Sequence, residues 1–370
     1  MIKHILITGG AGFIGSHLAD VLLEQGYTVR VLDTLSEQVH GKEKKRPDYL
    51  NPEVELQIGD VRNANDIRIA LEGIDAVFHM AALVGVGQSM YEIREYTDVN
   101  NVGTATLLQA LIDHPVKKLI VASSMSIYGE GLYEDIDGNL KEHCERKLSD
   151  LKSDKWEMIE KENYLKPIPT PETKTPKLSS VYALSKYDQE RLSLITGKAY
   201  NIPTTALRFF NVYGTRQALS NPYTGVLAIF ASRLLNDKPP MIFEDGYQKR
   251  DFIHVKDVAR ACRMAMEAEQ SNGEVYNVGS GNQYTITSIA QKLAEVMNKD
   301  IQPEVNGKYR VGDIRHCFAD TTKIKNELGF EPQVNFEDGL YELAEWLKDQ
   351  IATDKVNQAS TELESRGLTV

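Results

Sequence analysis

The chain reads Thr8-Gly9-Gly10-Ala11-Gly12-Phe13-Ile14-Gly15 directly after the apolar stretch Ile5-Leu6-Ile7. Glycines at positions 9, 12 and 15 permit a tight turn, a close approach of the backbone to a pyrophosphate, and close packing of a helix. A helix that begins here directs its free amide groups and its dipole toward the phosphates. Strand, turn and helix come in the order that this mechanism requires, so the stretch predicts a dinucleotide-binding βαβ unit. The expected cofactor contacts are Gly9, Gly12, Phe13, Ile14 and Gly15.

The sequence around this motif alternates between short apolar runs and longer amphipathic ones. The strand candidates up to about residue 125 are 5–7, 28–32, 54–58, 76–79 and 119–122. Helical patterns lie between them, for example at 13–25 and 94–113. This alternation predicts an α/β fold with a Rossmann-like, doubly wound parallel sheet.

A charged segment at about residues 130–178 interrupts the alternation and ends in Lys166-Pro167-Ile168-Pro169-Thr170-Pro171. The sequence leaves open whether this segment is a lid-like insertion or a long surface excursion. A helix at 181–200 and a strand at 204–208 then complete a first domain over residues 1–208. A smaller mixed α/β domain is expected over 209–350, with some segments free to return to the first domain. The last residues, 351–370, are expected to form a polar, mobile tail.

Composition limits the classes of partner. The 370 residues carry a formal net charge of -11, which disfavours nucleic acid and anionic membranes because both attract basic surfaces. There is no run of about 18 apolar residues, and the N-terminus lacks the pattern of a signal peptide. Cys144, Cys262 and Cys317 are scattered, and no histidine pair has ligand spacing, so neither disulfides nor a metal site is expected. These features favour a cytoplasmic protein.

Two aspartates follow the second and third strand candidates. Asp33 lies 18 residues beyond Gly15, where a carboxylate accepts hydrogen bonds from the adenosine ribose and repels a 2′-phosphate. NAD is therefore expected rather than NADP, with a turn-capping Asp as the alternative. Asp60 is expected to accept from the adenine amino group, or otherwise to cap the helix that follows.

Tyr182 and Lys186 are spaced i, i+4, which places both on one face of the predicted helix. An ammonium beside a phenol favours the phenolate, so Lys186 is expected to lower the pKa of Tyr182 for acid–base chemistry. By itself such a pair more often marks a solvated helix face. Ser124 adds a hydroxyl after the fifth strand, at the carboxyl end of the sheet, where ligands bind in such folds. These three residues are the predicted catalytic set.

Taken together, the motifs resemble the extended short-chain dehydrogenase/reductase superfamily, and within it the NAD-dependent nucleotide-sugar epimerases and dehydratases. The resemblance extends from about residue 2 to residue 348, apart from the charged excursion. It implies that Tyr182 is the acid/base, that Lys186 modulates its pKa and binds the cofactor ribose, and that Ser124 bonds the sugar O4. It also implies further cofactor contacts, from Val61, Ala81 and the Asn100 of Asp98-Val99-Asn100.

The same resemblance implies that the second domain binds a nucleotide-diphosphate sugar. Asn211, in Phe209-Phe210-Asn211, would face the diphosphate. Arg250 and Arg310 would clamp it, since planar guanidinium groups match phosphate oxygens. Asp313 would meet the nucleotide ribose. The remaining implied substrate contacts are Ser126 and Val226.

The residues after Ser124 narrow the reaction. Dehydratases of the family carry an Asp-Glu pair there and decarboxylases a Glu, whereas this chain has Met125 and Ser126. Hydride chemistry at C4 remains, which implies an NAD-dependent 4-epimerase acting through a transient 4-keto sugar. A ketosugar reductase dependent on NADPH is disfavoured by Asp33. A non-catalytic NAD-sensing regulator is disfavoured because Tyr182 and Lys186 are both present.

A narrower resemblance is to dTDP-L-rhamnose 4-epimerases, carried by the excursion and by Arg216-Gln217-Ala218-Leu219-Ser220-Asn221-Pro222-Tyr223-Thr224-Gly225-Val226-Leu227. The expected reaction is then dTDP-L-rhamnose to dTDP-6-deoxy-L-talose, with 4-epimerisation of UDP-glucose or UDP-N-acetylglucosamine as the alternative. An apolar site for C6 would use Met125 and Cys317. The family also implies a homodimer through the helices at 94–113 and 181–200, each of which would have to bury an outer apolar stripe.

Overall fold

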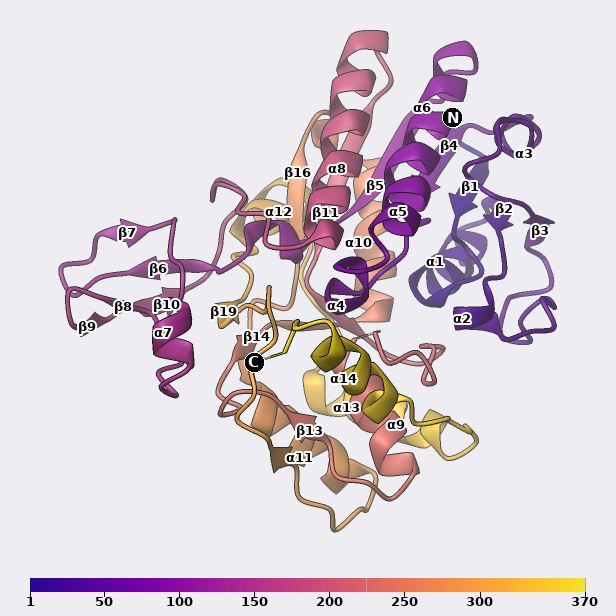
Figure 1. Ribbon diagram of the computed structural model, residues 1–370. Coiled ribbons are helices and arrows are strands. Elements are labelled where there is room, and N and C mark those ends of the chain that lie inside the picture. Colours follow the sequence, from indigo (N-terminus) through magenta and orange to yellow (C-terminus); the bar gives the residue numbers. More distant parts are fainter. Residues whose placement is uncertain (224, 370) are drawn as a thin grey trace.

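A seven-stranded parallel sheet forms the centre of the larger lobe (Figure 1). The structure is a computed structural model that describes residues 1–223 and 225–369. The strands lie in the order β16-β11-β5-β4-β1-β2-β3, and all neighbours pair in parallel. Their bounds are β1 (His4–Thr8), β2 (Thr28–Asp33), β3 (Glu55–Ile58), β4 (Ala76–His79), β5 (Lys118–Ser124), β11 (Thr204–Phe209) and β16 (Val275–Val278). The predicted doubly wound α/β fold is confirmed.

The central strands are buried along their whole length. Every residue of β4, β5 and β11 is buried, as expected of parallel strands that helices cover on both faces. The strand bounds differ from those predicted by at most two residues. The order of the strands reverses direction between β1 and β4, and in such sheets ligands bind at this point, beyond the carboxyl ends of the strands.

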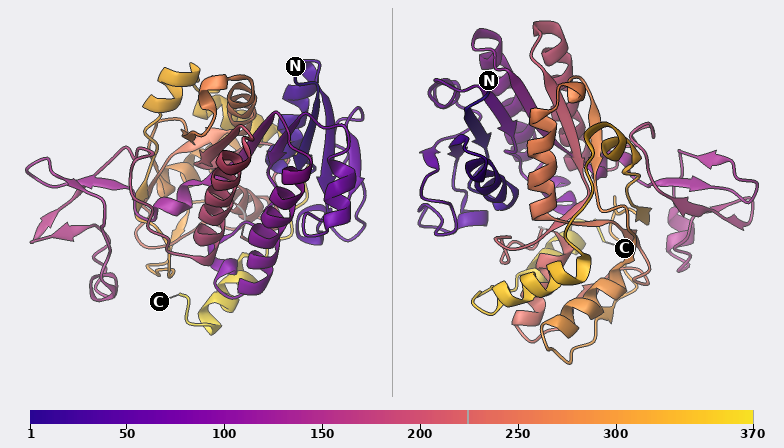
Figure 2. Two further views of the ribbon diagram at one scale, coloured as in Figure 1. Left: turned by 90° about the horizontal axis from the view of Figure 1, so that it is seen from above. Right: turned by 180° about the vertical axis from the view of Figure 1, so that it is seen from behind.

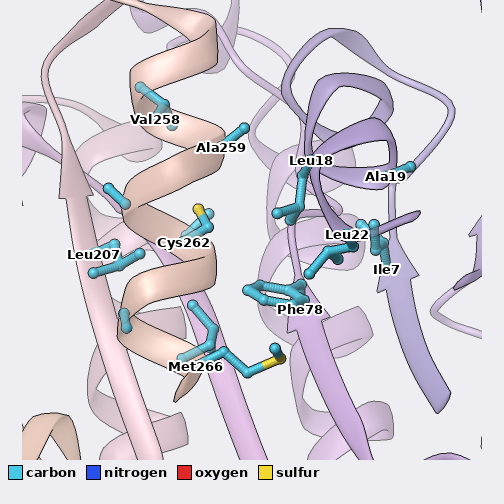
Figure 3. Close-up of a cluster of buried hydrophobic side chains, with 14 of the residues drawn as sticks. Ile7, Leu18, Ala19, Leu22, Phe78, Leu207, Val258, Ala259, Cys262 and Met266 are labelled. Atoms are coloured by element: carbon cyan, nitrogen blue, oxygen red, sulfur yellow. The ribbon is translucent and has the colours of Figure 1, made fainter. Parts of the chain in front are cut away.

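Helices form a layer on each face of the sheet. On one face lie α1 (Phe13–Glu24) and α10 (Val255–Glu267), and Figure 3 shows Leu22 of α1 and Met266 of α10 meeting around Phe78 of β4. The view from behind in Figure 2 shows α10 in front of the strands. The opposite face carries α3 (Ala64–Ala70), α6 (Gly103–Asp113) and α8 (Val181–Tyr200), with a second apolar core beneath them.

The single helix predicted at 94–113 is interrupted. A π-helical turn, η1 (Thr97–Val102), separates α5 (Ile93–Tyr96) from α6. Such turns inside helices often accompany functional sites. Here the turn contains the buried Asn100.

The smaller lobe has its own apolar core, built by α9 (Val226–Leu235), α11 (Ile286–Val296) and α13 (Phe336–Leu347). Short strands form three small sheets of their own: β12 (Asn211–Tyr213) with β15 (Phe252–His254), β13 (Met241–Ile242) with β18 (Glu304–Val305), and β14 (Lys249–Arg250) between β17 (Tyr284–Thr285) and β19 (His316–Cys317). Three segments beyond residue 209 return to the larger lobe, namely α10, β16 and α12 (Thr322–Leu328), and η3 (Glu269–Ser271) lies between α10 and β16.

The charged excursion forms a small arm that projects from one side of the molecule (Figure 1). It contains β6 (Leu132–Glu134), β7 (Leu140–Lys141), α7 (Leu148–Leu151), β8 (Ile159–Glu160), β9 (Asn163–Tyr164) and β10 (Lys166–Ile168). Buried ionic contacts fix its base to the body. Arg146 of the arm lies 2.7 Å from Glu244, and Arg315 donates to Glu157 of the arm at 3.0 Å.

The C-terminal residues differ from the mobile tail expected from their polarity. They form a helix, α14 (Val356–Ser365), because Ala359 and Leu363 are spaced i, i+4 and are both buried against the body. Within the described residues, no helix is long and apolar enough to cross a membrane.

Candidate active site

A cavity of about 1130 Å³ lies at the carboxyl ends of the strands, between the sheet and the smaller lobe. It gathers residues from positions 9 to 368 of the chain. The predicted site residues line it, apart from Asn100 and Cys317: Gly9, Gly12, Phe13, Ile14, Gly15, Asp33, Asp60, Val61, Ala81, Ser124, Met125, Ser126, Tyr182, Lys186, Asn211, Val226, Arg250, Arg310 and Asp313. The motifs that are dispersed in the sequence therefore meet in one place.

The glycine-rich turn has the shape that a pyrophosphate requires. Gly9 has φ +68°, and a Cβ added there would lie 2.8 Å from Cα of Ala81. A Cβ on Gly15 would lie 2.5 Å from Cα of Gly10, so the helix can approach the turn this closely only if residue 15 is glycine. Gly12 caps α1 with no side-chain hydrogen bond, which leaves the first amide groups of the helix for a ligand. This cradle fits a dinucleotide.

Asp33 lines the cavity beside this cradle. Its carboxylate is positioned by the amides of Ala11 (3.1 Å) and Leu35 (2.9 Å) at the end of β2. His40, in the short helix α2 (Glu37–His40), has its Nε2 3.8 Å from the same carboxylate. Burial lowers the pKa of His40, which favours the neutral imidazole beside that carboxylate.

Asp60 has a partner of its own chain. The guanidinium of Arg62 lies 2.6 Å from its carboxylate, and hydrogen bonds from Arg62 lower the pKa of Asp60 although its partial burial opposes this. The helix-cap alternative is wrong: Asn63 caps α3, accepting from the amide of Asn65 at 2.9 Å.

Ser124 and Tyr182 meet over the end of β5. Ser124 Oγ accepts hydrogen bonds from the amide (3.2 Å) and hydroxyl (3.0 Å) of Ser126, in the 3₁₀ turn η2 (Met125–Tyr128). Tyr182 lies in the first turn of α8, and its amide donates to Ser89 Oγ at 3.0 Å, at the end of the short helix α4 (Val86–Ser89). Burial raises the pKa of Tyr182, and a hydrogen bond with Ser124 lowers it.

Lys186 is fully buried beside the cavity. Its Nζ donates to Oε1 of Gln189 at 2.6 Å, and burial lowers its pKa to about 7. The expected depression of the pKa of Tyr182 by Lys186 is not found, because burial dominates at both groups and Gln189 holds the ammonium. Beyond Gln189, a network runs through Thr104 (2.8 Å) to His79, whose pKa burial lowers to about 3.

Asn100 stands behind the wall of the cavity rather than on it. Its amide accepts from the backbone N–H of Leu83 (2.7 Å) and donates to the carbonyl of the same residue (3.1 Å). It also donates to Ser185 Oγ of α8 at 2.9 Å. Asn100 thus fixes the loop after β4 to the helix that carries Tyr182. Its predicted contact with the cofactor stays a prediction, from a position directly behind the loop that lines the cavity.

Two arginines in the smaller lobe have different surroundings. The guanidinium of Arg250 donates to the carbonyls of Lys249 and Arg315, both at 2.9 Å, and to that of Ile314. Arg310 lies 4.4 Å from the ring centre of Phe243 and donates to Asp313 at 2.8 Å. These contacts orient both planar groups at the cavity, as binding of an anionic group requires.

Three amide side chains at the cavity have a buried oxygen with no hydrogen-bond partner among the described residues. They are Asn211, Gln217 and Gln248. An unpaired buried polar atom is costly, and a bound ligand would relieve the cost. Of the three, only Asn211 lies in a motif to which the sequence gives a role. Gln217 lies in the stretch 216–227 that carried the narrower resemblance, whereas Gln248 is separated from Arg250 by only one residue but matches no motif.

Cys317 is not part of the cavity surface. It is buried in a small apolar cluster with Tyr128 and Phe210, and its thiol lies 3.9 Å from Thr170 Oγ1. The expected contribution of Cys317 to a C6 site is therefore wrong, whereas Met125 lines the cavity. Among the described residues, no group of three His, Cys, Asp or Glu side chains is placed to hold a metal ion.

Comparisons with known proteins agree with this geometry. Residues 5–149 and 157–279 match the model of the NAD-dependent epimerase/dehydratase family. The dTDP-L-rhamnose 4-epimerase of Burkholderia thailandensis is 34% identical, over 94% of this chain and 96% of that protein.

Two solved structures cover 94% of this chain and 99% of their own. UDP-glucose 4-epimerase of Thermotoga maritima, solved with UDP-glucose, has a TM-score of 0.76 and 33% identity. UDP-glucuronic acid 4-epimerase of Bacillus cereus, solved with UDP-glucuronic acid and NAD, has a TM-score of 0.77 and 29% identity. Matches of this extent establish kinship as well as fold, and the chain belongs to the NAD-dependent epimerase/dehydratase family of enzymes.

Proposed function

We propose that the protein is an NAD-dependent nucleotide-sugar 4-epimerase whose substrate is dTDP-L-rhamnose and whose product is dTDP-6-deoxy-L-talose. The observation that carries the reaction type is the content of the cavity next to Ser124. Met125 and Ser126 line it where an eliminating or decarboxylating relative would carry carboxylates, and neither can act as that acid or base at neutral pH. Tyr182 and Ser124 are suited to moving a single proton, that of the sugar O4 hydroxyl.

The chemistry divides between cofactor and protein. NAD, when bound, accepts a hydride from C4 and returns it. As the phenolate, a form that the positive charges of Lys186 and of the bound nicotinamide would favour, Tyr182 would take the proton of the O4 hydroxyl and later return it, while Ser124 holds that oxygen through its hydroxyl. Lys186 supplies positive charge and a hydrogen-bond donor to the cofactor ribose. Inversion requires the intermediate 4-keto sugar to turn, so that it presents its other face before the hydride returns.

The remaining site residues would hold the two nucleotides. Asp33 would accept from the adenosine ribose of the cofactor, and Gly12 to Gly15 would bind its pyrophosphate at the start of α1. The substrate diphosphate would be bound by Arg250, Arg310 and Asn211. Asp313 would exchange its hydrogen bond with Arg310 for one with the substrate ribose. We propose a homodimer as the working unit.

The similarity to UDP-sugar 4-epimerases supports UDP-glucose and UDP-N-acetylglucosamine as the second candidate substrates. The test is to incubate the purified protein with each nucleotide sugar separately and to follow the anomeric protons by NMR. The proposal requires dTDP-L-rhamnose to reach an equilibrium mixture with its C4 epimer without added cofactor. Formation of a 4-keto-6-deoxy sugar or loss of carbon dioxide would overturn it.

A further inference from the structure

The C-terminal segment, residues 351–369, forms one wall of the cavity. The side chains that it contributes are Val356, Ala359, Ser360, Leu363 and Leu368, and all but Ser360 are apolar. We refer to these five residues as the C-terminal wall. In Figure 1, α14 crosses in front of α9 and α13, beneath α4.

The beginning of this segment is fastened to the smaller lobe by buried ionic groups. Asp354 lies 2.8 Å from Nζ of Lys238, and Arg233 of α9 donates to Asn357 at 3.0 Å. The side chains of Arg233 and Asp354 are only 5% and 2% exposed. Leaving either charge unpaired in such a setting is strongly unfavourable, so the start of the wall is fixed.

The far end makes contacts on both sides of the cavity. The carbonyl of Leu368 accepts from the amide of Val311, next to Arg310. The guanidinium of Arg366 lies 4.5 Å from the ring centre of Tyr91, whose hydroxyl meets that of Tyr223 at 2.5 Å. The segment thus spans from α9 in the smaller lobe to the loop that follows α4.

Leu363 brings the wall close to the catalytic groups. A Cβ on Gly87 would lie 3.3 Å from Cδ2 of Leu363, so the leucine rests against α4 where a side chain would be crowded. Two residues beyond Gly87, Ser89 Oγ of α4 accepts a hydrogen bond from the amide of Tyr182. One short helix therefore separates Leu363 from the proposed acid/base.

We propose that the C-terminal wall encloses the sugar half of the bound substrate, and that Leu363 keeps the reacting ring in the cavity while it turns. This inference rests on the proposed function. An apolar surface offers the ring no hydrogen bond that would fix one orientation, and it excludes water. It therefore permits rotation of the 4-keto sugar and resists its escape.

The test compares Leu363→Asp with Gln358→Asp, which adds the same charge to the exposed side of the same helix. Binding of dTDP-L-rhamnose, UDP-glucose and dTDP to the NAD-loaded proteins is measured by calorimetry. We expect Leu363→Asp to weaken the affinity for the nucleotide sugar that binds by about tenfold or more, the scale of losing a small apolar contact, and to leave dTDP binding unchanged. Gln358→Asp should match the native protein. Equal affinities in both variants would overturn the inference.

A second measurement follows the intermediate. The amount of free 4-keto sugar, trapped with hydroxylamine during turnover, should rise with Leu363→Asp and also after deletion of residues 351–370. If the Asp variant fails to fold, Leu363→Ala is expected to show the same changes to a smaller extent, and native behaviour of Leu363→Ala would count against the wall. A native protein that epimerises no nucleotide sugar would refute the proposed function. The calorimetry needs no turnover and would still decide the role of Leu363.

Discussion

Gln189 Oε1 accepts a hydrogen bond of 2.6 Å from Nζ of Lys186, one turn further along α8. The same amide donates to Thr104 Oγ1 at 2.8 Å and is completely buried. It therefore positions the ammonium group while adding no charge of its own. Since burial lowers the pKa of Lys186 to about 7, the charged form is present below that pH and is lost as the pH rises through it.

Replacement of Gln189 should consequently move the pH profile. Gln189→Glu places a carboxylate beside the ammonium and should raise the pKa of Lys186, so that the alkaline limb of kcat/KM shifts to higher pH. Gln189→Met removes the acceptor and should shift that limb to lower pH. The measurement is kcat/KM across the neutral and alkaline range, with thermal melting to verify folding. An alkaline limb that stays in place in both variants would show that Lys186 does not set it.

Loss of the Tyr182 hydroxyl should abolish most of the activity without unfolding the protein. Tyr182→Phe removes the phenol that meets Ser124, and acid–base catalysis is worth ~10²–10⁴-fold in rate. Steady-state turnover and thermal melting of the variant give both numbers. Tyr187→Phe, five positions along the same helix, is the matched control and should keep native turnover. If Tyr182→Phe kept native turnover, another residue would be the acid/base.

Much of the larger lobe could be predicted from local sequence because its rules are local. The strands of the sheet are apolar runs, and the turn at Gly9 to Gly15 needs glycine for steric reasons that a short motif records. Helix α8 has the predicted bounds, since Ser180 caps it and Asn201 ends it in a left-handed conformation. The motifs at Ser124, Tyr182 and Lys186 reach the cavity because each stands at the end of a strand or in the first turns of a helix.

Other parts of the site depend on contacts between residues far apart in the sequence. Asn100 belongs to a motif, yet its amide supports Leu83, a relationship that no spacing reveals. The C-terminal wall has a polar sequence, and its order comes from the pairing of Arg233 with Asp354 across 121 positions. The pKa of Tyr182 follows from burial, which sequence spacing does not report.

A buried ion pair beneath the site should be important for stability. Glu190 accepts two hydrogen bonds from Arg208, at 2.7 and 3.0 Å, and a third from Ser123, and the Glu190 side chain is 0% exposed. Glu190→Ala leaves the buried guanidinium of Arg208 without a carboxylate partner and should destabilise the protein by about 3–5 kcal/mol. Urea unfolding measures this. Glu72→Ala, which breaks the exposed pair with Arg68, should cost only ~0–1 kcal/mol. Comparable losses in both variants would contradict the assignment.

The outer face of α8 carries exposed apolar side chains, consistent with the proposed dimer. Leu184 and Ile195 are 50% and 58% exposed. They are eleven positions apart, about three helical turns, so both lie on one face of α8. In Figure 1, α8 lies beside α6, so the two helices present a common surface. Glu at both positions should convert a dimer into a monomer in sedimentation velocity at micromolar concentration. Ile136→Glu, at an exposed site of the arm, should leave the dimer intact. A native monomer would refute the dimer.

The choice of substrate should follow from the polarity of the cavity next to Ser124. Met125, the neighbour of Ser124, and Leu363 of the C-terminal wall are both apolar and both line the cavity, so each would offer the methyl group of a 6-deoxy sugar an apolar contact. An apolar surface rejects an added hydroxyl by only ~10²-fold, whereas a polar one rejects its absence far more strongly. We therefore expect kcat/KM to favour dTDP-L-rhamnose over UDP-glucose, with residual activity on a hydroxylated sugar that otherwise fits.

Met125→Ser tests the same argument from within the protein. The introduced hydroxyl should reduce the preference for dTDP-L-rhamnose over UDP-glucose. It can bond a hydroxyl on C6, and it is left without a partner when the deoxy sugar binds. Both substrates are measured side by side with native protein and variant. An apolar surface does not favour an added hydroxyl. If kcat/KM of the native protein were about tenfold or more higher for UDP-glucose than for dTDP-L-rhamnose, the rhamnose assignment would fail. The roles of Tyr182 and Ser124 in 4-epimerisation would stand, because they act on O4 and are indifferent to C6.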